Sequence, residues 1–236
     1  MITASEVISS ANEICSEQKN TGIESFLDRV TFGDCVKLMR HMPDGCVDLI
    51  ATDPPYVARY CDRGGRRIFN DDNERWIYPA FLEAFRVLKN DAYCLSFYGW
   101  HKADKFLAAW RECGFRSVGH FTWVKTYSSS IGFTKMWHES AYLLVKGNPA
   151  MPVNPPADVL PWKYTGNKLH PTQKPVSALT PIIDAYSQKG DIVLDPFAGS
   201  GTTGIAARAH GRRFVLFEKD ELYFSKAKAR LEIGED

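Results

Sequence analysis

The sequence predicts an α/β protein whose doubly wound, mainly parallel sheet carries an antiparallel hairpin at its edge. Runs such as Val47–Thr52 and Asp191–Asp195 alternate with helical patterns, an order typical of a parallel sheet. These runs are rich in apolar residues, as are strands that are buried on both faces. Two β-patterned runs, Ser117–Lys125 and Ser140–Lys146, flank a polar loop and indicate an antiparallel pair.

The chain divides into a short extension and one domain. Thr3 and Glu6 form a capping box before apolar residues at helical spacing, so residues 1–28 are expected to be an N-terminal helical extension. Residues 29–236 are expected to form a single domain. Its further strands are expected at Val30–Phe32, Ala92–Phe97 and Arg213–Glu218. Its helices are expected at Cys35–Met42, Tyr78–Leu88, Lys102–Cys113, Val176–Ser187, Gly201–His210 and Leu222–Leu231.

Composition restricts the class of protein. The net charge of +1 gives no field that would recruit a polyanion to the whole surface, so such a partner must meet a local patch. The six cysteines are scattered without a C-x-x-C pair, and the histidines lack metal-ligand spacing, so we expect no metal site. No signal peptide or membrane span is expected. We expect a soluble, cytoplasmic protein of a bacterial cell, or a phage-encoded one acting in its host.

The segment IVLDPFAGSGTTG, residues 192–204, predicts a strand, a glycine turn and the start of a helix. Its glycines match G-x-G-x-x-G, and Glu218 ends the next strand, where a ribose-binding acid would lie. This pattern leaves a nicotinamide-dependent enzyme open. However, Asp195 and Pro196 at the strand end supply a carboxylate and remove an N–H donor, which suits a pyrophosphate poorly. A ligand with a cationic centre, a ribose and no phosphate fits better, and S-adenosylmethionine is such a ligand.

The segment Asp53-Pro54-Pro55-Tyr56 follows a buried strand. Proline fixes its own φ and restricts the residue before it, so this corner is stiff. The prolines contribute carbonyl groups but no N–H groups, and the Asp53 carboxylate only accepts hydrogen bonds when ionised. The natural complement is an –NH2 group on a planar base, which would lie beside the ring of Tyr56.

Three motifs together, DPPY, DPFAGSGTT and LHPTQKPV, resemble those of the beta-class DNA amino-methyltransferases, the adenine-N6 and cytosine-N4 methylases. The resemblance extends from about Phe32 to Leu231. It implies a Rossmann-like methyltransferase fold in a circularly permuted motif order, with the target-amine motif before the cofactor motif. It also implies S-adenosyl-L-methionine as the cofactor and double-stranded DNA as the partner.

The resemblance assigns roles to particular residues. The catalytic corner would be Asp53, Pro54, Pro55 and Tyr56. Asp34 would meet the cofactor adenine, Glu218 its ribose, and Lys174 its carboxylate. The full set implied for the cofactor is Asp34, Thr172, Gln173, Lys174, Asp195, Phe197, Gly199, Ser200, Gly201, Thr202 and Glu218.

The expected reaction transfers a methyl group from S-adenosylmethionine to the N6 amine of an adenine that has been flipped out of DNA. In this family DPPY usually accompanies adenine, and the N4 amine of cytosine remains an alternative. A nicotinamide-dependent oxidoreductase is a more distant alternative. Methylation of an amine in RNA or protein would use the same acceptor corner.

Three loops are expected to face DNA: residues 57–77, 125–137 and 147–169. Their basic side chains suit phosphate contacts, although a solvated surface would carry the same residues. The candidates are Arg59, Arg63, Arg66, Arg67, Lys125 and Lys135. The third loop lies where restriction-type relatives carry a base-reading insert, and it is short. Relaxed specificity, a short recognition site or recognition by a homodimer would each be compatible with that shortness.

Overall fold

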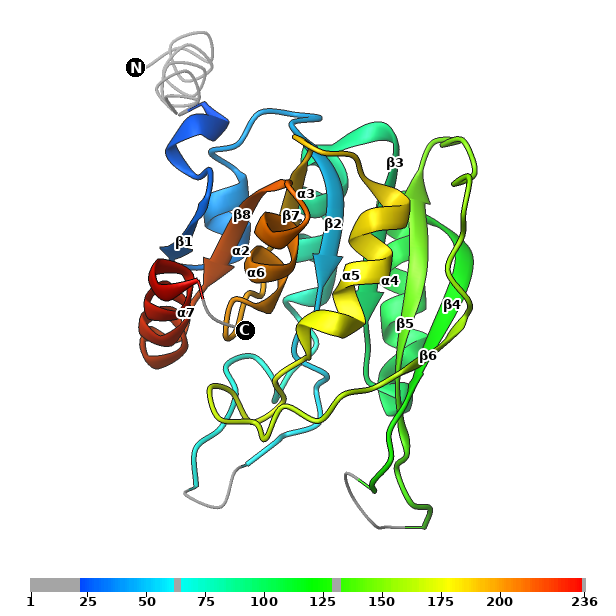
Figure 1. Ribbon diagram of the computed structural model, residues 1–236, viewed down its shortest axis with the longest axis vertical. Helices are drawn as coiled ribbons and strands as arrows, with labels where there is room; N and C mark the ends of the chain where they lie inside the picture. Colours follow the sequence, from blue (N-terminus) through cyan, green and yellow to red (C-terminus); the bar gives the residue numbers. More distant parts are fainter. Residues whose placement is uncertain (1–21, 62–64, 129–132, 235–236) are drawn as a thin grey trace, which may run out of the picture.

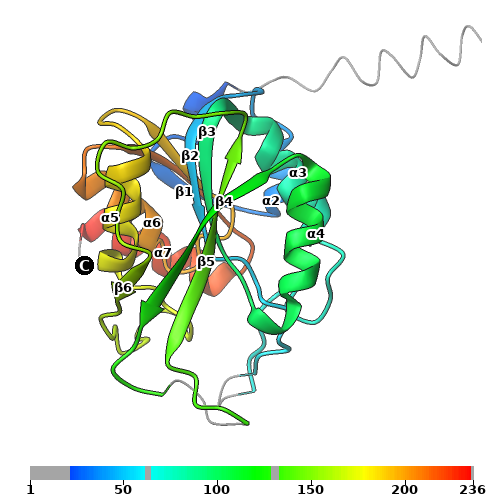
Figure 2. The same cartoon turned by 90° about the vertical axis from the view of Figure 1, so that its right-hand side faces the viewer.

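The computed structural model describes residues 22–61, 65–128 and 133–234, so residues 1–21 of the expected N-terminal helical extension lie outside the described part (Figure 1). The described residues form an eight-stranded sheet between two layers of helices, as the two views at right angles show (Figures 1 and 2). Among the described residues, no helix combines the length and the apolar character that a membrane span requires.

The sheet is mainly parallel, as predicted. Its strand order is β1-β8-β7-β2-β3-β5-β4-β6, and only β5 runs against its neighbours in the described part of the chain. The strands are β1 (Arg29–Phe32), β2 (Val47–Thr52), β3 (Leu88–Phe97), β4 (Arg116–Val124), β5 (His138–Lys146), β6 (Val159–Pro161), β7 (Ile192–Asp195) and β8 (Arg213–Glu218).

Helices cover both faces of the sheet, which makes the fold doubly wound (Figure 2). One face of the sheet is covered by α2 (Cys35–Met39), α3 (Ile77–Val87) and α4 (Ala103–Cys113), which pack on one apolar cluster. The opposite face of the sheet is covered by α5 (Val176–Tyr186), α6 (Thr202–Ala209) and α7 (Glu221–Ile233), which pack on a second cluster. Short 3₁₀ helices at Ile23–Ser25 and Trp100–Lys102 complete the described elements.

The apolar composition of the central strands is explained by this arrangement. Ile50 in β2 belongs to one cluster, whereas its neighbours Leu49 and Ala51 belong to the other, and all three side chains are buried. Because successive side chains of a strand point to opposite faces, a strand covered on both sides needs apolar residues at nearly every position.

The main difference from the prediction lies in residues 147–169, which were expected to be loop throughout. Val159–Pro161 forms β6, which pairs in parallel with β4 and makes that end of the sheet. The predicted antiparallel pair is therefore present, but it is not outermost. Pro161 is tolerated in β6 because an edge strand leaves one side of its backbone without hydrogen bonds to a neighbouring strand.

Among the other predicted strands and helices, the two largest boundary differences concern β3 and α2. Strand β3 begins at Leu88 rather than Ala92, because α3 ends at Val87 and the next residue is already extended. Helix α2 ends at Met39 rather than Met42, and the N–H groups of His41 and Met42 bond three residues back as the last turn tightens.

The sheet changes winding direction between β7 and β2. The crossover from β7 to β8 uses α6, whereas the crossover from β2 to β3 uses α3 on the opposite face. In such sheets ligands bind beyond the carboxyl ends of the strands at the point of reversal. The residues that follow β2 and β7 are therefore expected to form the site.

Helix α6 packs closely on its neighbours at Gly204. An added Cβ there would lie 2.7 Å from Cδ1 of Leu216 in β8 and 3.1 Å from Cδ2 of Leu231 in α7. The third glycine of the fingerprint thus serves helix packing.

We predict that Gly204→Ala lowers the free energy of unfolding by about 1–3 kcal/mol through overpacking. The helix propensity of alanine alone would change it by about 1 kcal/mol in the opposite direction. Urea denaturation measures the difference, and Gly22→Ala is the control because nothing lies within 4 Å of a Cβ added at that position. A stabilised Gly204→Ala protein would contradict the packing argument.

Candidate active site

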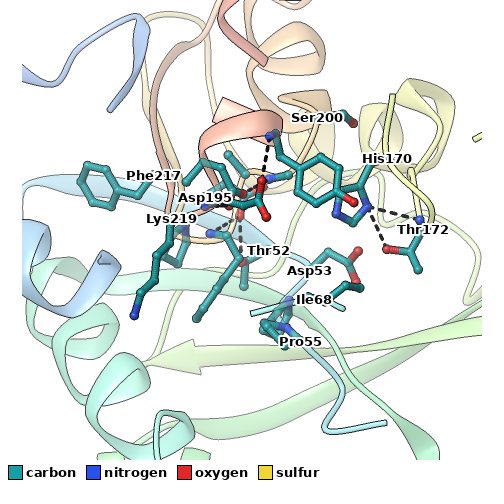
Figure 3. A pocket seen from close by; sticks show the side chains of 18 of the residues that line it. Thr52, Asp53, Pro55, Ile68, His170, Thr172, Asp195, Ser200, Phe217 and Lys219 are labelled. Carbon is teal, nitrogen blue, oxygen red and sulfur yellow. Dashed lines mark hydrogen bonds between the residues drawn. The ribbon is translucent and has the colours of Figure 1, made fainter. Parts of the chain in front are cut away.

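A pocket opens beyond the carboxyl ends of β2, β7 and β8, at the predicted reversal point (Figure 3). Asp53 follows β2, Asp195 ends β7 and Glu218 ends β8, so three carboxylates enter it from neighbouring strands. The turn that holds His170 and Thr172 borders the same pocket before α5 begins. The target-amine motif and the glycine loop are thus adjacent in space, although they are far apart in the chain.

Two hydrogen bonds to Asp53 hold the corner after β2. Asp53 Oδ1 accepts a hydrogen bond from the Tyr56 hydroxyl at 2.8 Å, and Oδ2 accepts one from Lys174 Nζ at 2.6 Å. Burial raises the pKa of Asp53, and the charge of Lys174 opposes that rise. Burial and the nearby carboxylates raise the pKa of Tyr56 well above 10, so its hydroxyl remains a hydrogen-bond donor.

Lys174 lies in an aromatic surround. Its Nζ is 5.0 Å from the ring centre of Phe97, 5.3 Å from that of Tyr56 and 6.0 Å from that of Trp162. Burial alone would lower the pKa of Lys174, but the carboxylates of Asp53 and Glu139 hold it above its ordinary value. The ammonium group therefore stays charged beside the corner.

The Asp195 carboxylate connects the two motifs. Its Oδ1 accepts hydrogen bonds from Thr52 Oγ1 at 2.8 Å and from the Phe197 N–H at 3.0 Å. Its Oδ2 accepts a hydrogen bond from Thr203 Oγ1 at 2.6 Å. The side chain is buried, and burial raises its pKa to about 6 despite these donors.

Glu218 lies across the glycine turn from Asp195. Its Oε2 accepts a hydrogen bond from the Gly199 N–H at 2.8 Å, and its Oε1 accepts one from the Asp220 N–H at 2.7 Å. Burial raises the pKa of Glu218 to about 7. Gly199 has a φ of +52°, which favours glycine and lets the backbone approach the carboxylate.

The remaining cofactor candidates close the pocket. Asp34 caps α2 through the N–H groups of Val36 and Lys37 and pairs with Lys219 at 2.9 Å. Thr202 Oγ1 donates to the Lys174 carbonyl at 3.1 Å, which joins the start of α6 to the turn before α5.

That turn is fixed by its own hydrogen bonds. His170 Nδ1 accepts a hydrogen bond from the Thr172 N–H at 3.2 Å, and burial lowers the pKa of His170 to about 3. Gln173 Oε1 accepts a hydrogen bond from the Leu169 N–H at 3.1 Å. The neutral imidazole can therefore act as the acceptor that shapes this turn.

The structure brings together nearly all of the predicted catalytic and cofactor residues. The residues of both sets that line the pocket are Asp34, Asp53, Pro54, Pro55, Tyr56, Thr172, Gln173, Lys174, Asp195, Phe197, Gly199, Ser200, Thr202 and Glu218. Gly201 does not line it. It precedes α6 with a φ of +79° and lies close to Ala227, so it serves the turn and the packing of α7.

Only some of the side chains predicted to contact DNA are exposed on the surface. The contact of Lys125 with DNA needs correction, because Lys125 is only 4% exposed and forms a buried ion pair with Glu139. Arg66 Nη2 lies 2.5 Å from Asp220 Oδ1, and its guanidinium lies over the ring of Tyr223, so an internal contact already engages it. The exposed candidates are Arg59, Arg67 and Lys135, and Arg63 lies outside the described residues.

Three residues around the site were not predicted from the sequence. Thr52 and Thr203 supply buried hydroxyl donors to Asp195, and their positions beside the two motifs were the available signal. Glu139 precedes the apolar part of β5, and a charge at such a position was the signal that it has a partner.

Comparison with known proteins defines the class of this protein. A family model of the N6/N4 methyltransferases, described as DNA methylase, matches residues 47–229. The chain belongs to this family, whose members transfer methyl groups from S-adenosylmethionine to the exocyclic amines of DNA bases. The predictions of family, fold and methyl donor are confirmed, and the alternative of a nicotinamide-dependent oxidoreductase is set aside.

Particular relatives agree with this membership. The chain is 48% identical over 205 residues to YubD, a candidate methylase of Escherichia coli (strain K12), covering 87% of this chain and 90% of that protein. It is 25% identical over 252 residues to the type II methyltransferase M.HinfI of Haemophilus influenzae, covering 89% and 69%.

Two solved structures show the same fold. The complex of M1.HpyAVI with SAM has a TM-score of 0.69 at 24% identity, covering 86% of this chain and 98% of that one. The cytosine-N4-specific PvuII DNA methyltransferase has a TM-score of 0.67 at 18% identity, covering 87% and 93%.

The raised pKa of Glu218 predicts a pH-dependent stability in the absence of ligand. Since the folded state holds this proton more tightly than the unfolded state, the contribution of Glu218 to stability is full below about pH 4.5 and is lost as the pH rises through about 7. Glu218→Gln should therefore flatten the fall in unfolding free energy over this range. Denaturation at a series of pH values measures it, with the exposed Glu232→Gln as control. Parallel curves for wild type and Glu218→Gln would refute the assignment.

Proposed function

We propose that this chain transfers a methyl group from S-adenosylmethionine to the N6 amine of an adenine flipped out of double-stranded DNA. One observation carries the proposal. The acceptor-only corner at Asp53 and the glycine loop at Asp195 follow neighbouring strands, and the Thr52–Asp195 hydrogen bond of 2.8 Å joins their ends. A methyl donor bound at the end of β7 would thus face an amine held at the end of β2.

The pocket suits the cofactor on chemical grounds. Gly199 leaves the approach to the loop free of a side chain, and Asp195 adds negative charge near the methionine end. Glu218 is available to accept from ribose hydroxyls, and Asp34 lines the pocket beyond it. When bound there, S-adenosylmethionine supplies an electrophilic methyl group.

The corner residues would position the amine. The target nitrogen donates to Asp53 and to the Pro54 carbonyl, which draws its lone pair out of conjugation and directs it to the methyl group. Tyr56 presents its ring to the base. Asp53 need not deprotonate the neutral amine, because it only has to accept a proton from the far more acidic ammonium that forms after transfer.

Lys174 would bind both the Asp53 carboxylate and the cofactor. An ammonium group has three donors, and one of them meets Asp53 at 2.6 Å. Within the described residues its Nζ makes no other hydrogen bond, so the remaining donors can meet the carboxylate of the cofactor. Its charge opposes the effect of burial on the pKa of Asp53 and so favours the ionised carboxylate, which the acceptor role requires.

The N4 amine of cytosine is the second candidate. The same corner accepts either amine, and PvuII methyltransferase, a protein of the same fold, is cytosine-N4-specific. The Asp at position 53 favours adenine through the family preference. A homodimer and double-stranded DNA as the form recognised stay predictions.

Incubation of the protein with labelled S-adenosylmethionine and plasmid DNA, followed by digestion to nucleosides, tests the proposal. Label in 6-methyladenine is the expected result. Label in 4-methylcytosine would select the second candidate, and no label in DNA would overturn both.

Substitution of Asp53→Asn is predicted to reduce the single-turnover rate at least about 100-fold, since the amide has no charge and cannot accept the product proton. Binding of S-adenosylmethionine, measured by calorimetry, should change little. The exposed Asp104→Asn in α4 is the matched control. Full activity of the Asp53→Asn protein would contradict the proposed role.

Phosphate contacts should come from the exposed arginines of the loop after β2. We predict that Arg59→Ala with Arg67→Ala weakens DNA binding and reduces the slope of log K against log salt by about 0.9 for each phosphate that is no longer neutralised. Fluorescence anisotropy at several salt concentrations measures this slope. Arg111→Ala is the control, because it lies before β4 at the amino edge of the sheet, away from the pocket. An unchanged slope would exclude these two side chains.

A further inference from the structure

Glu139 lies behind the wall of the pocket rather than in it. It is the second residue of β5, it pairs with Trp123 of β4, and it does not line the cavity. Its Oε1 forms an ion pair with Lys125 Nζ, and the two side chains are 21% and 4% exposed. Neither residue has a part in the reaction proposed above.

The hydroxyl of Tyr56 lies between two carboxylates. It is 2.8 Å from Asp53 Oδ1, to which it donates, and 3.5 Å from Glu139 Oε2. A hydroxyl has one hydrogen, so it can donate fully to only one of them at a time. The longer distance shows that Asp53 is the acceptor in this arrangement.

This arrangement occupies the corner that the substrate needs. Tyr56 bonds Oδ1 of Asp53 and Lys174 bonds Oδ2, so both oxygens already accept a hydrogen bond. An incoming amine that donates to Oδ1 would compete with the tyrosine hydroxyl for the lone pairs of one oxygen. The competition ends if the hydroxyl has a second acceptor within reach.

We propose that Glu139 is a positioning residue for methyl transfer, an inference that rests on the function proposed above. It is the second acceptor to which the Tyr56 hydroxyl turns when the target amine donates to Asp53. The hydrogen stays on Tyr56 throughout, and only its acceptor changes. The ring of Tyr56 keeps its place beside the base because one of the two carboxylates holds its hydroxyl at every stage.

The surrounding charges equip Glu139 for this role. Burial alone would raise its pKa, but the ammonium groups of Lys174 and Lys125 hold the pKa of Glu139 below its ordinary value. It therefore remains a charged acceptor, which binds a hydroxyl more strongly than a neutral one does. Lys125 also fixes the direction of the carboxylate, since its own Nζ is confined near the rings of Tyr127 and Trp162.

A double-mutant cycle separates this role from a structural one. Glu139→Gln keeps the shape of the side chain and weakens the second acceptor. It should reduce the single-turnover rate on DNA about tenfold at saturating S-adenosylmethionine. In the Tyr56→Phe background the same substitution should change the rate less than about twofold, because no hydroxyl remains to be held. Affinities for DNA and S-adenosylmethionine should stay within about twofold in both backgrounds.

Each other outcome overturns the inference. Equal losses of rate in both backgrounds would show that Glu139 only supports the fold, and no loss in either would show that it is idle. A loss confined to affinity would mean that it acts on binding. If Glu139→Gln does not fold, Lys125→Gln combined with Glu139→Gln removes the buried pair together and is measured in the same two backgrounds. A wild-type protein that methylates no DNA would overturn the proposed function and this inference with it, whereas an active wild type with additive effects overturns this inference alone.

Discussion

The buried carboxylate of Asp195 is the constraint on which the site depends. It ends β7, yet its hydrogen bonds come from Thr52 at the end of β2, from Thr203 in α6 and from the backbone of Phe197. A buried carboxylate is costly unless donors surround it, so these contacts stabilise one relative position of the two strand ends and the helix. The backbone pairing of β2 with β7 places the amine corner beside the cofactor loop, and the Asp195 contacts then stabilise this relative position.

A second group of polar side chains, in and behind the pocket wall, balances its own charges. Two carboxylates, Asp53 and Glu139, face two ammonium groups, Lys174 and Lys125, and the hydroxyl of Tyr56 lies between the carboxylates. Removing one charged member would leave a charge without its partner in a region that water reaches poorly, which costs stability. The complete group also suits catalysis, because a rigid group of donors and acceptors needs little rearrangement when charge moves.

The sequence predicted what depends on local pattern. The strands of the parallel part and the turn at Asp53 follow from apolar runs and from proline, which act within a few residues. It could not predict β6, because three residues ending in Pro161 carry no period and pair only where β4 offers an edge. Nor could it predict that Lys125 is buried, since the partner that makes its burial tolerable, Glu139, comes from the next strand. Long-range polar pairs of this kind leave little trace in a single sequence.

The motif order of the chain is a consequence of the same geometry. Methyl transfer needs an amine acceptor and a cofactor loop at adjacent carboxyl ends, and β2 and β7 are neighbours in the sheet although the loop comes much later in the sequence. Each motif also has a hydrogen bond of its own, from the Tyr56 hydroxyl to Asp53 in one and from the Phe197 N–H to Asp195 in the other. Since a parallel sheet aligns the ends of its strands whatever their order in the chain, the chemistry constrains which strands are neighbours and leaves the order of the motifs free.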